Sequence, residues 1–285
     1  MLKLQTPVVF QPSRVGVTLS DTVMVLGSCF ADNIGSRMAD YGFNVCVNPF
    51  GTLYNPVSLA NAVARLENGL PFSEDECVEM GAGAGLICSF SHHTSFARPT
   101  REQFLSDANS SLEEAHRFWL EANKVLITLG TSFCYRNLAS GEVVANCLKR
   151  PAAEFSREML SLENVSILLD VLVSRHPDKQ FIFTVSPVRH LSDGAHANQL
   201  SKSTLLLALE KLSWNPDVDY FPAYEIFMDE LRDYRFYAED MSHPSSQAVD
   251  YIWERFCDFA VSDSERDTLQ KNIKACRQSR HRPLH

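Results

Sequence analysis

Short apolar runs recur along this chain, and stretches with helical spacing separate them. Continuous apolar runs of this kind are typical of strands that are buried on both faces, as in a parallel sheet. The last run is the weakest, because Pro222 cannot donate to a sheet ladder. The alternation of strands and helices predicts right-handed crossovers and a three-layer α/β domain with a parallel sheet of about five strands. The runs are Thr22–Leu26, Phe43–Val47, Asn123–Leu129, Gln180–Val185 and Val218–Tyr224.

The segments between these runs carry apolar residues at helical spacing. The region of about 55–120 stands as an insertion between the second and third strands, with two short strands expected around the sequence GAGAG. A hairpin with its turn at Ser140 and Gly141 is expected after the third strand. We find no repeat or flexible linker, so residues 1–285 predict one domain that ends in a basic helical tail over about 263–285. The expected helices cover 27–43, Ser58–Leu66, Pro99–Ala122, Leu160–Ser174, Asn198–Leu212 and the stretch from Pro244.

Composition excludes several classes of protein. Hydrophobic residues make up 45% of the chain and charged residues 21%, which is a globular balance and not that of a disordered chain. The net charge of −9 argues against a nucleic-acid partner, since phosphate binding needs a basic face. No apolar run approaches the roughly 20 residues of a membrane span, and the first residues lack a signal-peptide core. A cytoplasmic protein without a membrane anchor is therefore expected.

Cofactor and metal motifs are missing from the sequence. Eight cysteines are present, but none forms a CxxC pair, so reduced thiols are expected in place of disulfides or a zinc site. No GxxxxGKS loop occurs and no GxGxxG follows the first strand, which disfavours nucleotide chemistry. Neither a metal nor an organic cofactor is expected.

In an open parallel sheet, ligands bind beyond the carboxyl ends of the strands. Ser28 follows the first strand there, directly after Gly27. It is either the N-cap of the following helix or a nucleophile, since a helix N-terminus stabilises negative charge near its hydroxyl oxygen. Its neighbour Cys29 is either a rival nucleophile or a small buried side chain.

A serine nucleophile needs a base, and a candidate lies near the other end of the chain. Asp240 stands three residues before His243, and this spacing in a turn lets the carboxylate reach the imidazole Nδ1. Such a contact fixes the tautomer and leaves Nε2 free to take a proton. The alternative is a helix-entry turn with a surface Asp and a solvated His.

The strings around these residues resemble a known family. GSCFA at 27–31 looks like the signature of the GSCFA family, which belongs to the SGNH (GDSL-like) hydrolase superfamily. LGTSFCYR, GEVVANCLKRP, SPVRHLSDGAHANQLSK and DELRDYRFYAEDMSHPSSQAVDYIWERF are similar to blocks of the same family. The resemblance implies a flavodoxin-like sheet with a Ser–His–Asp site. In it Ser28 matches the nucleophile, and Asp240 and His243 match the late Asp-x-x-His pair.

The resemblance also implies an oxyanion hole, and here the sequence departs from the superfamily. Gly51 matches the loop position whose backbone N–H is one donor. Ser132 stands where the superfamily usually has an asparagine, and losing one such donor typically lowers the rate about 100- to 1,000-fold. The candidate donors in its place are Ser132 itself, through its hydroxyl or its N–H, and Asn146. Leu148 stands where we expect a histidine in the family block.

Three further side chains are candidates for binding substrate. Arg189 and His190 follow the fourth strand, where an arginine either grips a carboxylate, phosphate or sugar hydroxyl or pairs with one of the many acids. His92 lies in the insertion, next to His93. We expect this pair in a surface loop, where His92 would touch substrate if the insertion folds over the site.

These observations predict a serine esterase that acts on a small-molecule or glycan ester, plausibly an acyl or acetyl group on a carbohydrate. Ser28, His243 and Asp240 would be catalytic. The alternatives are an acyltransferase that uses the same residues and a non-catalytic module that binds a glycan or a protein. The sequence does not determine the oligomeric state.

Overall fold

The structure, a computed structural model, describes residues 5–280. Its main sheet consists of β1 (Thr22–Gly27), β2 (Asn44–Val47), β5 (Lys124–Leu129), β9 (Gln180–Val185) and β10 (Val218–Phe221). These strands are ordered β10–β9–β5–β1–β2 across the sheet, and every pairing is parallel. The predicted α/β class and the five-strand parallel sheet are confirmed.

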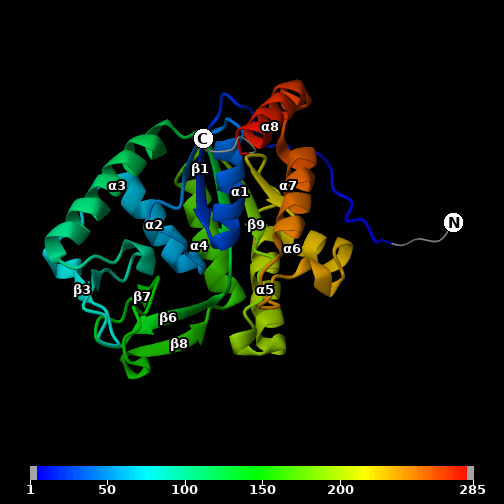
Figure 1. Cartoon of the computed structure of the whole chain (residues 1–285). Coiled ribbons are helices and arrows are strands. Elements are labelled where there is room, and N and C mark those ends of the chain that lie inside the picture. Colours follow the sequence, from blue (N-terminus) through cyan, green and yellow to red (C-terminus); the bar gives the residue numbers. More distant parts are fainter. Residues whose placement is uncertain (1–4, 281–285) are drawn as a thin grey trace.

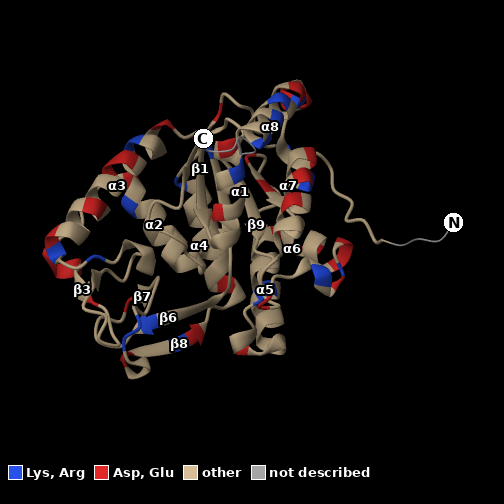
Figure 2. Ribbon diagram, in the orientation of Figure 1, with Lys and Arg blue, Asp and Glu red and all other residues tan. Residues whose placement is uncertain are grey.

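Helices cover both faces of the sheet, as Figure 1 shows. Val23 and Val25 of β1 belong to one hydrophobic core, whereas Met24 and Leu26 belong to another, because side chains alternate along a strand. The first core is covered by α1 (Cys29–Asp40), α7 (Ser246–Ala260) and α8 (Arg266–Arg280). The second is covered by α2 (Pro56–Asn68), α3 (Arg101–Glu121), α4 (Leu162–Ser174) and α5 (Ala195–Glu210). Charged residues gather on outer helices such as α3 and α8 (Figure 2).

Outside the main sheet, two short antiparallel pairings were predicted correctly and one strand was missed. In the insertion, β3 (Val78–Glu79) pairs antiparallel with β4 (Ile87–Cys88), as predicted. The hairpin of β6 (Phe133–Asn137) and β7 (Val143–Val144) is also confirmed. Strand β8 (Phe155–Met159) was not predicted, because FSREM contains two charged residues and no continuous apolar run. It is stabilised by antiparallel pairing with β6.

The fifth strand is shorter than predicted and the tail is helical as predicted. β10 ends at Phe221, before Pro222, and is followed by α6 (Ala223–Glu225) and a π-helical turn over Ile226–Glu230. The tail forms α8, while 281–285 lie outside the described residues. All eight cysteines are free thiols. Among the described residues, no helix is both long and apolar enough to cross a membrane.

The strand register brings three chain segments to one edge of the sheet. Gly27 at the end of β1 pairs with Thr128 of β5, and Thr128 pairs with Thr184 of β9. Gly27 has a φ of 136°, and a Cβ there would lie 2.2 Å from the Thr128 carbonyl oxygen. Only glycine therefore fits this close approach of two strands. The loops that follow β1, β5 and β9 all start at this edge.

Candidate functional site

Ser28 lies at the turn between β1 and α1 and is almost completely buried, with 1% of its surface exposed. Its Oγ accepts a hydrogen bond from the backbone N–H of Phe30 at 3.3 Å, and its own N–H donates to the Thr128 carbonyl at 3.2 Å. The N-cap interpretation is confirmed. Its role as a nucleophile stays a prediction, because an N-cap oxygen also sits in the positive field of the helix terminus.

Cys29 is a poor rival nucleophile. Burial first, and then the charge of Asp32, raises the pKa of the Cys29 thiol. The thiolate is the reactive form of cysteine, so this environment disfavours its attack on a substrate.

Asp240 and His243 are joined as the spacing predicted. Asp240 Oδ2 lies 2.5 Å from His243 Nδ1, and Oδ1 accepts the backbone N–H groups of Ser242 and His243, each at 2.9 Å. The two backbone donors, and then the imidazole, lower the pKa of Asp240 to about 2. An ionised carboxylate only accepts hydrogen bonds, so Nδ1 is the donor and Nε2 carries no proton when the ring is neutral.

His243 and Ser28 belong to the same edge of the sheet. The turn that holds His243 is tied to the loop after β9, because the Arg189 N–H donates to the Ser242 carbonyl at 3.0 Å. The charge of His243 also acts on His190, whose ring packs edge-to-face on Tyr54 at 6.0 Å. Among the contacts of residues 5–280, none is a hydrogen bond between Ser28 and His243.

The segment that contains Tyr54 crosses the ends of β1 and β5. The Leu53 N–H donates to the Gly27 carbonyl at 2.8 Å, and the Tyr54 carbonyl accepts the N–H groups of Gly130 and Thr131 at 2.8 and 3.0 Å. This segment therefore closes the carboxyl edge of the sheet where Ser28 lies.

The two predicted oxyanion donors already have partners for their backbone N–H groups. Gly51 N–H donates to the Asn48 carbonyl at 2.7 Å, and Ser132 N–H donates to Ser201 Oγ at 2.8 Å. The Ser132 hydroxyl is different, since it is buried and has no partner among the described residues. Glycine at position 51 is also required sterically, because a Cβ would lie 2.4 Å from His93 Cβ.

The expectation for His92 was wrong. Its side chain is fully buried and packs against four phenylalanine rings, because the insertion builds part of the second core. Its Nδ1 lies 2.6 Å from Ser89 Oγ, and burial first, then the charge of Arg65, lowers the pKa of His92 to about 3. It is a core residue and is not available to substrate. The rings are those of Phe50, Phe72, Phe96 and Phe104.

Asn146 lies elsewhere. Its Oδ1 accepts the Leu148 N–H at 2.8 Å, and its side chain lines a groove with Tyr135 and Arg150. Leu148 itself is fully buried. No contact of Asn146 joins it to Ser28 within the described part of the chain.

Arg189 and His190 do follow β9 at the site edge. His190 is neutral at physiological pH, because burial first, and then the charge of Lys202, lowers its pKa to about 4. Of the two alternatives for Arg189, the ion pair with an acid is not found among the described residues, and its side chain contacts the Met228 sulfur instead.

Two polar residues that the sequence reasoning missed hold this edge together. Lys202 is completely buried, and its Nζ donates to the carbonyls of Gly130 at 2.6 Å and Ser186 at 2.7 Å. Asn48 accepts the Gly27 N–H at 2.7 Å and donates to Asp32 at 2.5 Å. Lys202 had a detectable signal, because it falls at helical spacing before the apolar Leu205 and Leu209, on the inward face of α5.

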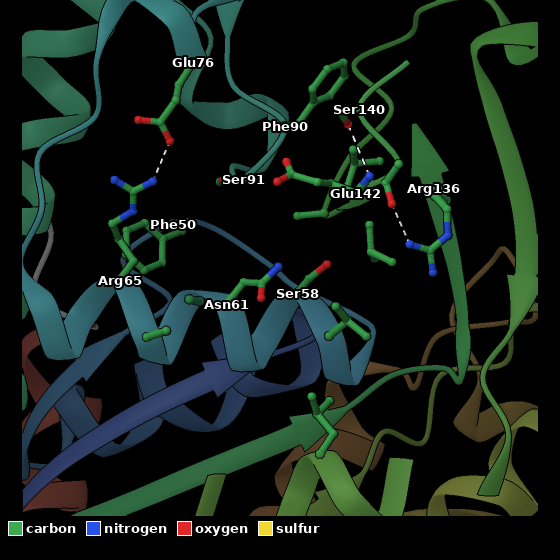
Figure 3. Close-up of a pocket in the computed structure, with 18 of the residues that line it drawn as sticks. Phe50, Ser58, Asn61, Arg65, Glu76, Phe90, Ser91, Arg136, Ser140 and Glu142 are labelled. Carbon is green, nitrogen blue, oxygen red and sulfur yellow. Dashed lines mark hydrogen bonds and ion pairs between the residues drawn. The ribbon is translucent and has the colours of Figure 1, made fainter. Parts of the chain in front are cut away.

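A large cavity lies apart from Ser28 and His243, neither of which lines it. It has a volume of about 1140 Å³ and runs between α2, α4, the β6–β7 hairpin and the insertion. Figure 3 shows Asn61 of α2 and Glu142 of the hairpin pointing into it. Arg65 and Glu76 form an ion pair of 2.5 Å at one side.

Comparison with known proteins gives one match. The model of the GSCFA family matches residues 22–256, a range that contains Ser28, Asp240 and His243. No curated protein and no solved structure matches the chain. Because the match spans the main sheet and most of its helices, the chain belongs to the GSCFA family.

Proposed function

We propose that this chain is a serine esterase with the flavodoxin-like fold of SGNH hydrolases. Its substrate would be a small-molecule or glycan ester, plausibly with an acyl or acetyl group on a carbohydrate. The observation that carries the proposal is the contact of 2.5 Å between Asp240 and His243, which orients the imidazole as a base for a serine. The candidate serine is Ser28, which follows β1 and caps α1. The reaction needs neither a metal nor an organic cofactor, and a cytoplasmic location is part of the same proposal.

The reaction would begin when His243 Nε2 takes the proton of Ser28 Oγ, which attacks the acyl carbon. Asp240 stabilises the imidazolium that forms. The unpartnered hydroxyl of Ser132 donates to the oxyanion. His243 then protonates the leaving alcohol, and water, deprotonated by His243, releases the acid and restores Ser28.

Substrate must first reach Ser28. The hydroxyl is buried, so the proposal includes a displacement that opens it. His243 is accessible from solvent, since its side chain is 47% exposed.

A fluorophosphonate probe tests the proposal. We expect the purified protein to hydrolyse short aryl acetates and to form a covalent adduct that mass spectrometry maps to Ser28. An adduct at another serine, or none under conditions where a known serine hydrolase is labelled fully, would refute the proposed nucleophile.

Replacement of Asp240 by asparagine is expected to lower kcat by about 100- to 10,000-fold. If the asparagine carbonyl keeps the two backbone donors, its NH₂ group faces Nδ1 and drives the proton of the neutral ring to Nε2. The ring then cannot accept the serine proton. The measurement is kcat on an aryl acetate against pH. The matched control is Glu239→Gln, because Glu239 is an exposed neighbour. A kcat within threefold of the wild type would contradict the assigned role.

One observation favours a second candidate, a non-catalytic module that binds a glycan or a protein. The large cavity in Figure 3 is lined by polar and apolar side chains but by neither Ser28 nor His243. The probe experiment separates the two, since a binding module forms no adduct.

A further inference from the structure

A second hollow opens beside the turn that holds His243. Its volume is about 480 Å³, and Arg189 and Met241 both line it. Its other walls are mainly apolar or aromatic, so a ligand there would contact phenylalanine and tyrosine rings and a methionine side chain. These walls are Leu191, Phe227, Met228, Tyr234 and Tyr237.

Arg189 carries the uncompensated charge of this hollow. Its guanidinium makes one side-chain contact, from Nη1 to the Met228 sulfur at 3.7 Å, and its Nε is buried with no partner among the described residues. The other charged residues of the wall are satisfied, since Arg232 pairs with Asp229 at 2.5 Å and Asp233 pairs with Arg235 at 3.6 Å. A guanidinium has five donors in a planar fork and usually meets a carboxylate or phosphate when it is partly buried.

A second basic side chain lies near this place. Lys202 is buried and feels the charge of Arg189. Its ammonium is bound by two carbonyl oxygens and by no carboxylate within the described residues. The nearby acid Asp240 is already committed to His243. The guanidinium of Arg189, which has no acidic partner among the described residues, therefore favours an anion on this side of the site.

We propose that the hollow binds an oxyanion, a carboxylate or a phosphate, carried by the substrate next to an apolar or ring-bearing group. The assignment to substrate rests on the proposed esterase function. The Arg189 guanidinium would donate bidentate hydrogen bonds to two oxygens of the group, and the aromatic walls would pack against the adjoining carbon skeleton. Because Met241 stands two residues before His243, an anion held here would lie beside the ester bond that is cleaved.

Catalysis gives the first test. We expect the wild type to prefer 4-nitrophenyl hemisuccinate over neutral 4-nitrophenyl acetate. In Arg189→Met this preference in kcat/KM should fall by about 10- to 100-fold, mainly through KM. Arg232→Met is the matched control, since Arg232 lines the same hollow but is already paired. Equal preference in the wild type and Arg189→Met would overturn the inference.

Binding gives a test that does not depend on turnover. Calorimetry with phenylphosphonate, benzoate and neutral benzamide should show that the two anions bind the wild type and Arg232→Met but not Arg189→Met. The two anions also distinguish a phosphate site from a carboxylate site. If the protein hydrolyses no ester but binds these anions through Arg189, the oxyanion site stands and the esterase proposal falls. If it hydrolyses neutral esters and binds no anion, the esterase proposal stands and the oxyanion site falls. If Arg189→Met does not fold, Arg189→Lys is used in its place, because lysine keeps the positive charge but lacks the planar guanidinium that binds two oxygens at once.

Discussion

Replacement of Ser28 by alanine is expected to lower esterase turnover by at least about 10,000-fold, to the level that binding and oxyanion contacts alone support. The reason is chemical, because the proposed mechanism places the attacking hydroxyl on Ser28, which follows β1 and caps α1. Cys29 does not replace it, since the pKa of its thiol is raised by burial. The measurement is the rate of aryl acetate hydrolysis together with loss of the fluorophosphonate adduct.

Ser28→Ala also removes a helix cap, so stability must be measured beside activity. Loss of the hydrogen bond from the Phe30 N–H is expected to cost about 0.5–2 kcal/mol. Ser161→Ala is the matched control, because Ser161 caps α4 by accepting the Asn164 N–H at 3.1 Å. It should lose similar stability and keep its activity. Ser28→Gly provides a second test, since glycine caps almost as well as serine and has no nucleophile. Activity that survives in Ser28→Gly would end the proposed mechanism.

The main sheet could be predicted from the sequence because each strand carries its own signal. The four residues of 23–26 are all apolar, as a strand covered on both faces requires. The contact between Asp240 and His243 was also predictable, since three residues separate the partners and the turn is local. Strand β8 lacked such a signal, because its stability comes from pairing with β6, about 20 residues earlier in the chain.

The site could be predicted only in part, because the rest depends on contacts between distant segments. His92 looked like a surface residue, yet Phe50 and Phe104 enclose it from outside its own loop. Gly51 matched a family position for an oxyanion donor, but in the structure its N–H donates to the Asn48 carbonyl within a local turn. Lys202 stood in an ordinary helix, and only the fold shows that its ammonium joins the ends of β5 and β9.

Replacement of Lys202 by methionine is expected to change how stability depends on pH. Burial lowers the pKa of Lys202 to about 7, from a model-compound value of 10.5, while the charges of Cys29 and Arg189 have smaller and opposite effects. Between these two values the unfolded chain binds a proton that the folded chain does not. The free energy of unfolding of the wild type therefore rises with pH in this window, by up to about 1.4 kcal/mol per unit for a single group.

Methionine has no proton to lose, so Lys202→Met should lack this rise, and it should be less stable at every pH because the carbonyls of Gly130 and Ser186 lose their donor. The measurement is urea unfolding of both proteins between pH 7 and 9, below the range where the Cys29 thiol ionises. Lys211→Met is the control, since Lys211 is exposed at the end of α5 and its loss should leave the slope unchanged. If the free energy of unfolding depends on pH in the same way in the wild type and in Lys202→Met, then Lys202 keeps its proton in the folded protein. The carbonyl ends of β5 and β9 would then hold a permanent cation at this edge, and the anion-favouring field beside Arg189 would persist at alkaline pH.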